Sequence, residues 1–194
     1  MKSKSLVLSN TYVTKVQKLD ALGQGVCTID GHTVFVPKTL PGEEIEIMIH
    51  AKKQGVYFAH LEKILFAASQ RISSECPHFS TCAGCSYLHV DYPQELVFKK
   101  QALECNLSYL SNKNYSLEVV ATPYRYAYRN RIQLHYQLGP NASIGFMNKQ
   151  NIVPIDLCLL PEKILQNFLQ DFLQKWQKIL PAHSPPQGHV ELQL

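Results

Sequence analysis

Cys76, Cys82 and Cys85 stand within ten positions of one another and are three of the six cysteines in the chain. Thiolates bind zinc and iron-sulfur clusters strongly, and the two-residue spacer before Cys85 lets two sulfurs point at one centre. The N-terminus has no apolar stretch long enough for a signal peptide, so the sequence predicts a cytoplasmic protein. In a reducing compartment, a tight cysteine cluster indicates a metal site rather than a disulfide framework.

A fourth ligand is needed, and the spacing leaves several candidates for it. A zinc site usually takes its last ligands from another close pair, and the sequence has no second Cys-x-x-Cys, although His78 and His89 lie nearby. Iron-sulfur ligation often combines three cysteines of one loop with a distant fourth, which favours Cys158. Cys27 and Cys105 are its rivals, but single cysteines on a strand or a helix are usually small core residues. Spacing alone leaves an iron-sulfur cluster, a zinc site and thiols without metal as open possibilities.

The formal net charge of +4 is concentrated in one window of the sequence. No acidic residue occurs between Glu118 and Asp156, and the cations and tyrosines of this window are Arg125, Arg129, Arg131, Lys149, Tyr124, Tyr126, Tyr128 and Tyr136. Cations contact phosphates and aromatic rings stack on bases, so this mixture is typical of a surface that binds single-stranded RNA. From the residues alone, a solvated strand face whose tyrosines complete the core is the competing interpretation.

The elements that position these residues fall into two kinds along the chain. Residues 8–66 contain alternating or β-branched runs such as "HTVFVP" and "EEIEIMI", separated by glycine and proline turns. Short strands at this spacing predict an all-β region, specifically a small five-stranded barrel. No apolar run approaches the roughly 18 to 20 residues that span a bilayer, so no membrane association is expected.

The region 71–180 mixes helices and strands and is predicted to be an α/β domain of the α+β kind. Asp91 can cap a helix over residues 92–111, strands follow within 129–156, and a second helix is predicted from Pro161 to Lys178. Apolar residues at helical spacing are expected to face the core: Leu96, Leu103, Leu107 and Leu110 in the first helix, and Ile164, Leu165, Phe168, Phe172 and Trp176 in the second.

Residues 181–194 are predicted to form a loop and the start of a truncated strand pair. The segment "HVELQL" alternates apolar and polar residues, which is typical of a strand with one buried face. No turn and no partner strand follow it in the sequence. The last domain is therefore expected to be incomplete.

Several of these segments resemble, in the same order, the middle domain of the RNA uracil-5-methyltransferases that carry a 4Fe-4S cluster. They are "CPHFSTCAGCSYLHVDYPQELVFKKQAL", "YRNRIQLHY", "IGFMNK" and "PIDLC". Upstream, "ALGQGVCTIDGHTVFVPKTLPGEEIEIMI" resembles the TRAM domain, an OB-like barrel that binds oligonucleotides. The resemblance covers nearly all of residues 11–194 and favours the ribosomal branch, which acts on 23S rRNA. It implies that the four cluster ligands are Cys76, Cys82, Cys85 and Cys158.

Because of the same resemblance, we expect the charged window to contact RNA. Single-stranded or loop RNA, most simply rRNA, is the implied partner. The expected contacts are Arg125, Arg129, Arg131, Lys149 and Tyr128, with Lys38 added from the barrel. No affinity for DNA is expected, and the protein is expected to be a monomer.

The resemblance also implies a part of an enzyme rather than a complete one. Family enzymes bind S-adenosylmethionine and carry their catalytic residues in a later domain, and this chain has no glycine-rich cofactor loop after a strand. We therefore assign no catalytic residue, and expect S-adenosylmethionine only in the full-length family enzyme. The alternative is a stand-alone RNA-binding, iron-sulfur or zinc module with no role in methylation.

Overall fold

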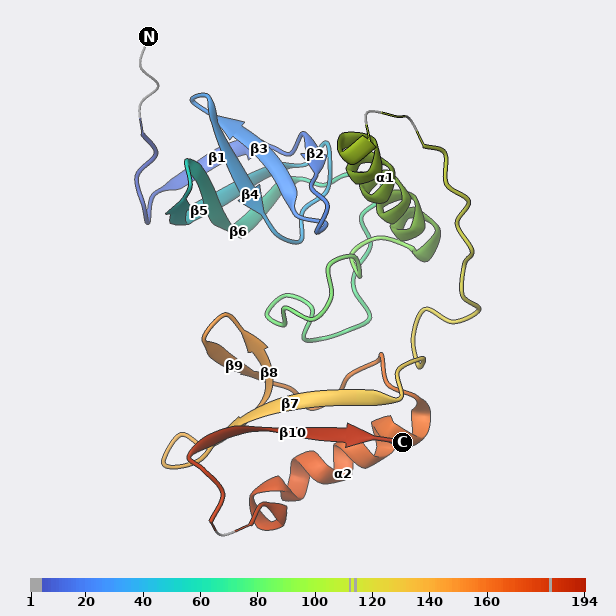
Figure 1. Cartoon of the computed structure of the whole chain (residues 1–194). Helices are drawn as coiled ribbons and strands as arrows, with labels where there is room; N and C mark the ends of the chain where they lie inside the picture. The colour runs from blue at the N-terminus through green and yellow to red at the C-terminus, as the bar shows by residue number, and fades with distance from the viewer. Residues whose placement is uncertain (1–4, 112, 114, 182) are drawn as a thin grey trace. The chain divides into compact units, whose positions relative to one another are not determined.

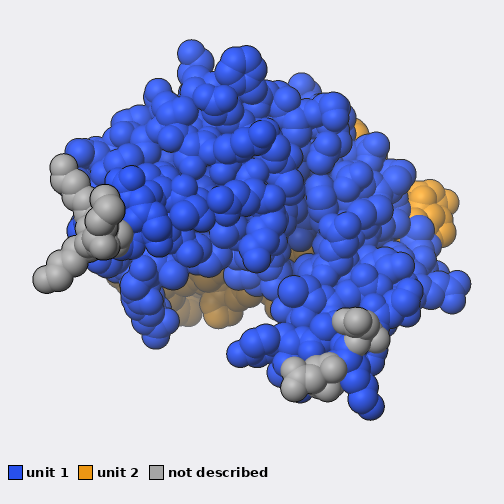
Figure 2. Space-filling model, turned by 90° about the horizontal axis from the view of Figure 1, so that it is seen from above, with its two compact units in different colours: residues 1–74, 86–121 blue, residues 75–85, 122–194 orange. Residues whose placement is uncertain are grey.

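The computed structural model describes residues 5–111, 113, 115–181 and 183–194. The chain divides into two compact units, shown in Figures 1 and 2: unit 1 is Met1–Ser74 with Ser86–Ala121, and unit 2 is Glu75–Cys85 with Thr122–Leu194. This division differs from the predicted ranges 8–66, 71–180 and 181–194. The helical segment after residue 86 packs with unit 1, whereas the short cysteine loop before it belongs to unit 2.

Unit 1 is built on one β-sheet of six strands within the described residues. The strands are β1 (Thr11–Lys15), β2 (Lys18–Leu19), β3 (Gly25–Ile29), β4 (His32–Val36), β5 (Glu44–Lys53) and β6 (Val56–Phe66). Their order is β1-β5-β6-β4-β3-β2, and neighbours are antiparallel except for β4 and β6. Alternate residues of β5 fill the core, where Ile45, Ile47 and Ile49 are fully buried. The period of two in the sequence predicted this face.

The all-β character predicted for this region is confirmed, but the five-stranded barrel is wrong. In the described part of the chain the hydrogen-bonded sheet has six strands and stays open, with β1 and β2 at its two edges. Both edges come from one chain segment that bends at Val16 and Gln17. There the Val16 amide donates to the Glu43 carbonyl and the Gln17 amide donates to the Val26 carbonyl, each at 2.9 Å. The segment that contains β1 and β2 thus forms both edges of the sheet. Alternation in the sequence does not reveal that its partner strand changes at this bend.

Helix α1 (Tyr92–Ser111) confirms the first predicted helix, and Asp91 caps it by accepting an amide of the first turn on Oδ1 at 2.8 Å. The predicted leucine face is not the buried one, because Leu103 and Leu110 are 51% and 78% exposed. The helix packs instead through Phe98, in a small cluster completed by Leu40 and Val90. The apolar patch that unit 1 offers therefore selects the face, and the leucine spacing does not.

A buried charged group fixes the segment that follows β6. Glu43 is fully buried, and its carboxylate lies 2.5 Å from Nε of Arg71 and accepts the Leu40 and Ala68 amides. Burial by itself raises the pKa of Glu43, but these hydrogen bonds outweigh it and hold the pKa below its ordinary value. His89 is also buried, and burial together with the Arg71 charge lowers its pKa to about 4.

Unit 2 contains an antiparallel sheet covered by a helix. Among its described residues the strands are β7 (Arg131–Gln137), β8 (Ser143–Asn148), β9 (Asn151–Pro154) and β10 (Gln187–Gln193), in the order β10-β7-β8-β9. Helix α2 (Lys163–Ile179) buries Leu165, Leu169, Phe172 and Trp176 against this sheet. Ile164 and Phe168 are 70% and 54% exposed, so the predicted stripe was displaced by part of a turn.

The C-terminal strand was predicted to lack a partner, and this prediction is wrong. Strand β10 pairs with β7 along its whole length, from Gln187 opposite Gln137 to Gln193 opposite Arg131. Leu192 is buried in the core of unit 2. The alternating pattern identified the strand, but its pairing with β7, which lies much earlier in the chain, is a long-range event. Neither helix of the described chain combines the length and apolar content that crossing a membrane requires.

Candidate metal centre and RNA-contact surface

The three clustered cysteines lie on the loop 75–85, which hydrogen-bonded turns shape. The Phe79 amide donates to the Cys76 carbonyl at 3.1 Å, and the Cys82 amide donates to the His78 carbonyl at 2.7 Å. The Gly84 amide donates to Sγ of Cys82 at 3.3 Å. The contact limits where this sulfur can point, so the turn orients one sulfur as a possible ligand.

Cys158 meets the loop cysteines at one cavity. It follows β9 and precedes α2, well separated in sequence from Cys85. All four predicted ligands line a cavity of about 450 Å³ in unit 2, beside the apolar side chains of Ile132, Phe146, Ile155, Leu157 and Leu160. The structure therefore brings together every cysteine that the resemblance selected.

The thiols are close enough to influence one another electrostatically. Burial, together with the charges of Cys158, Cys82 and Cys76, raises the pKa of the Cys85 thiol to about 11, and Arg129 acts in the opposite direction. Burial also raises the pKa of Cys158, and the charges of Cys76 and Cys82 act in the same direction. Four thiolates that repel one another in an apolar pocket are stabilised when positive metal centres bind them.

The donor set suits a cluster of several irons. In the residues that the structure describes, no group of three or more His, Cys, Asp or Glu side chains has the geometry to hold a metal ion. Thiolates are the usual ligands of iron-sulfur clusters, which would need a roomier site than one zinc ion. Four sulfurs around an apolar cavity, with the Arg129 cation in its wall, fit that description.

Two polar contacts join the loop 75–85 to the chain near Cys158. Nε2 of His78 lies 2.5 Å from Oδ1 of Asp156, and Nδ2 of Asn148 donates to the Thr81 carbonyl at 2.8 Å. The hydrogen bond from His78 holds the pKa of Asp156 below its ordinary range. The sequence gave no signal for either contact, because the partners come from segments far apart in the chain.

Arg129 and Arg131 are not only in contact with solvent, because both also line the cysteine cavity. Arg129 lies just before β7, and its guanidinium is 5.8 Å from the centroid of the Tyr128 ring. Arg131 begins β7, and its Nη1 lies 3.7 Å from Oε2 of Glu191 on β10. The sequence window without acidic residues therefore has a carboxylate beside it in the folded protein, because β10, which carries Glu191, pairs with β7.

The remaining predicted RNA contacts lie on both units. In unit 2, Tyr128 is 54% exposed, and Arg125 lies 5.8 Å from the ring centroid of half-buried Tyr126. Lys149 is exposed in the turn between β8 and β9. In unit 1, the Lys38 carbonyl accepts a hydrogen bond from Nη2 of Arg71 at 2.9 Å. Contact of these side chains with RNA stays a prediction.

The rival ligands have other environments. Cys27 is fully buried in the core of unit 1, as predicted for a small core residue, and burial raises its pKa to about 11. Cys105 was predicted to be a core residue too, and this is wrong, because it is exposed on α1. His89 is buried near Arg71 in unit 1, whereas His78 lines the cysteine cavity.

The chain has relatives among known proteins, although no protein-family profile matches it. The 23S rRNA (uracil(1939)-C(5))-methyltransferase RlmD of Haemophilus parainfluenzae is 30% identical over 187 residues, which are 93% of this chain and 42% of that protein. The protein of the same name from Pectobacterium carotovorum is 32% identical, covering 97% of this chain and 42% of that protein. Among solved structures, the Pyrococcus abyssi tRNA (uracil-54, C5)-methyltransferase in complex with S-adenosyl-L-homocysteine has a similar fold. Its TM-score is 0.59 at 24% identity, over 86% of this chain and 36% of that chain.

Along nearly its whole length, the chain is a homologue of RNA uracil-5-methyltransferases, which confirms the resemblance seen in the sequence. The curated relatives that it matches carry a more specific name, 23S rRNA (uracil-C5)-methyltransferase. The chain spans less than half the length of these relatives.

Proposed function

We propose that this chain is the RNA-recognition and 4Fe-4S-binding part of an S-adenosylmethionine-dependent enzyme that methylates uracil C5 in 23S rRNA. The observation that carries this proposal is the convergence of Cys76, Cys82, Cys85 and Cys158 on one cavity. The names of the curated relatives support the choice of ribosomal RNA as substrate. We place such an enzyme in the cytoplasm, as expected for an rRNA-modifying protein, and regard unit 1 as its TRAM-like part.

The four cysteines would hold the cluster, which when bound supplies a redox-capable centre and a link between two distant segments. Arg129 offsets the negative charge of the thiolates from the cavity wall. Ile155, Leu157 and Phe146 restrict the access of water to the sulfurs. The hydrogen bond between His78 and Asp156 keeps the cysteine loop next to the segment that carries Cys158.

RNA recognition would rest on the exposed tyrosines and arginines before β7. Tyr124 and Tyr128 are 72% and 54% exposed and offer ring faces on which unpaired bases can stack. Arg125 and Arg129 add phosphate contacts, and Lys149 and Lys38 contribute further positive charge. The competing interpretation, a solvated strand face, accounts less well for large aromatic rings left exposed beside arginines.

Methyl transfer itself needs bound S-adenosylmethionine, a cysteine nucleophile and a base, and we assign none of these to this chain. Cys27 is fully buried with a raised pKa, which disfavours the reactive thiolate. Cys105 is exposed on α1 in unit 1 and does not line the cavity of the four predicted ligands. We therefore attribute catalysis to a part of the relatives that this chain does not cover.

Metal analysis tests the cluster directly. Protein purified without oxygen should contain about four iron and four sulfide per chain and absorb visible light. Cys158→Ser should abolish both, whereas the same substitution at Cys105 should leave the iron content unchanged. Stoichiometric zinc without sulfide would instead identify a zinc module and contradict the proposal.

RNA binding is tested by its dependence on salt. Affinity for single-stranded RNA should fall as salt rises, and Arg129→Ala should reduce the log-log slope by about 0.7, the value for one lost phosphate contact on a single strand. Lys175→Ala on α2 removes one exposed charge elsewhere and serves as the control. Equal slopes for the parent and the Arg129 variant would remove this arginine from the interface.

A further inference from the structure

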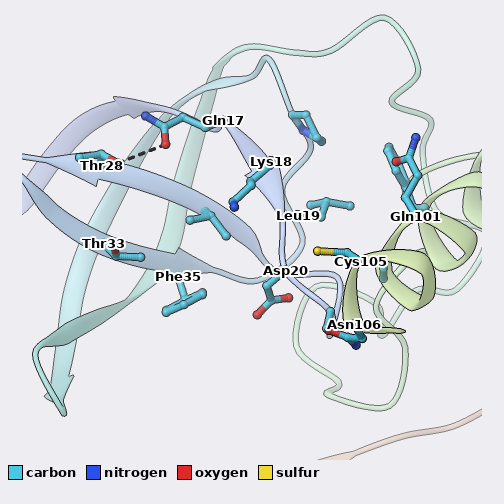
Figure 3. A pocket seen from close by; sticks show the side chains of 15 residues that line it. Gln17, Lys18, Leu19, Asp20, Thr28, Thr33, Phe35, Gln101, Cys105 and Asn106 are labelled. Carbon is cyan, nitrogen blue, oxygen red and sulfur yellow. Dashed lines mark hydrogen bonds between the residues drawn. The ribbon is translucent and has the colours of Figure 1, made fainter. Parts of the chain in front are cut away.

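A groove in unit 1 lies apart from the cysteines and has no role in the function proposed so far. It is a cavity of about 720 Å³ between the β2, β3 and β4 region of the sheet and helix α1. Figure 3 shows its side chains, with Lys18, Thr33 and Phe35 on the sheet side and Gln101, Cys105 and Asn106 on α1. This volume is within the range of small-ligand sites in proteins, roughly 300 to 1,000 Å³.

The polar part of the groove lining consists largely of neutral side chains that both donate and accept hydrogen bonds. Gln101 and Asn106 present side-chain amides from two successive turns of α1, and both are exposed. On the opposite wall the Thr28 hydroxyl donates to Oε1 of Gln17 at 3.1 Å. This hydrogen bond uses the oxygen of the Gln17 side-chain amide and not its amino group. Amide side chains match the mixed donor and acceptor edges of nucleobases.

The charges in the groove exclude a polyphosphate ligand. Lys18 is the cation of the lining. The Asp20 carboxylate lies beside it, where its Oδ1 accepts the amides of Leu22 and Gln24 at 2.9 and 2.8 Å and so stabilises the turn. One lysine next to a carboxylate can hold a single phosphodiester, but the pair has too little net positive charge to offset a group of several phosphates. A nucleotide within a strand, with one charge and one neutral base, fits this balance.

Apolar walls provide the remaining surface that a base requires. Phe35 is half-buried and stacks on Phe58 with ring centroids 5.6 Å apart, which fixes the plane of its ring. Phe98 contributes from α1 on the other side. Stacking of a base on an aromatic ring is largely independent of sequence, so an aromatic wall beside amides suits a general RNA contact.

We propose that this groove binds one unpaired ribonucleotide of the RNA substrate, with its base among Phe35, Gln101 and Asn106 and its phosphate at Lys18. The inference rests on the RNA-recognition function proposed above and adds a site in unit 1 to the surface of unit 2. Bound RNA would then contact the groove wall where Cys105 is exposed. In Figure 3 the Cys105 side chain points from α1 towards the strands.

Cys105 provides a reporter inside the groove. The holoprotein is treated with N-ethylmaleimide with and without a single-stranded oligoribonucleotide of about twelve residues. Labelling of the Cys105 peptide is followed by mass spectrometry, and fluorescence anisotropy gives the bound fraction. We expect the labelling rate of Cys105 to fall in proportion to the free fraction of protein.

The control places the thiol on another face of the same helix. Leu103 is 51% exposed and does not line the groove, so Leu103→Cys is combined with Cys105→Ser. This thiol should react equally fast with and without RNA. Unchanged labelling of Cys105 in a fully bound complex overturns the groove proposal, and so does equal protection of both thiols.

Two variants then separate the base contact from the phosphate contact. Gln101→Ala should weaken RNA binding about fivefold without altering its salt dependence, as expected for one lost hydrogen bond. Lys18→Gln should reduce the log-log salt slope by about 0.7. Parent-like binding by both variants, while Arg129→Ala is impaired, overturns the groove alone. Absence of RNA binding by the parent protein overturns the proposed function together with the groove.

Discussion

The two units enclose ionisable side chains in opposite electrostatic arrangements. In unit 1, buried Glu43 is balanced by Arg71 at 2.5 Å and by amide hydrogen bonds, so this group is neutralised within the chain. In unit 2, the cavity gathers four thiols, and the pKa values of Cys85 and Cys158 are raised by burial and by the neighbouring thiols, with Arg129 as an opposing charge. Unit 1 therefore carries its own counter-charge, whereas in unit 2 the proposed cluster would supply the positive charge that stabilises the thiolates.

Loss of the cluster is expected to have the largest effect, and to act on unit 2 alone. Metal binding at a structural site can contribute on the order of 10 kcal/mol to folding. Oxidative removal of the cluster with a chelator present should speed amide hydrogen exchange in the loop 75–85 and around Cys158. Strands β3 to β6 should keep their protection. A uniform loss of protection across both units would contradict the separation drawn between them.

Removal of the Glu43 charge should be the next largest effect, and should act on unit 1. Glu43→Gln leaves Arg71 with a side chain that is only 17% exposed and without its charged partner. A cost of about 3 kcal/mol in the free energy of unfolding is expected, measured by chemical denaturation. The matched change Glu191→Gln breaks the exposed pair with Arg131 and should cost less than about 0.5 kcal/mol. Equal costs would show that burial does not distinguish the two pairs.

Acid should weaken unit 1 through His89. Burial lowers the pKa of this imidazole from 6.5 to about 4, with Arg71 and Lys38 acting in the same direction and Glu43 in the opposite one. The unfolded chain then binds more protons than the folded chain, so stability falls as pH decreases from about 6.5 to about 4. The total loss is about 3 kcal/mol, at 1.36 kcal/mol per pKa unit.

His89→Gln should flatten the stability profile over that pH range. Glu43, whose pKa is lowered, keeps its contribution until the pH falls below about 4.5, and so accounts for any loss at lower pH. The measurement is a series of urea denaturation curves between pH 4 and about 7. A variant whose profile remains as steep as that of the parent would assign the pH dependence to another group.

The smallest expected effect concerns the contact between the cysteine loop and the Cys158 segment. Asp156→Asn weakens the hydrogen bond with His78 on an exposed surface, so the fold should persist. Exchange of the loop amides should quicken modestly, and cluster reconstitution should slow. The same substitution at exposed Asp171 on α2 should change neither rate. Identical behaviour of the two variants would exclude a positioning role for Asp156.

Local chemistry in the sequence predicted the elements well, and tertiary packing corrected which faces they bury. Asp91 marked the start of α1, because a cap needs only the residues next to it. The leucine spacing of α1 predicted the wrong buried face, because Leu110 is 78% exposed while Phe98 packs in the small cluster with Leu40. Helical spacing states which residues share a face, but the neighbouring surface decides which face is covered.

For the candidate site, the sequence by itself predicted which four cysteines would act as ligands. Short-range spacing on one loop marks three thiols as a set, because soft metals select cysteine by residue type. The resemblance supplied Cys158 as the fourth predicted ligand. Only the tertiary structure brought these cysteines to one cavity, paired β10 with β7, placed Glu191 beside Arg131 and enclosed the groove along α1. Each of these features joins residues that are far apart in the chain. Such contacts depend on the summed packing of whole elements, which no local pattern records.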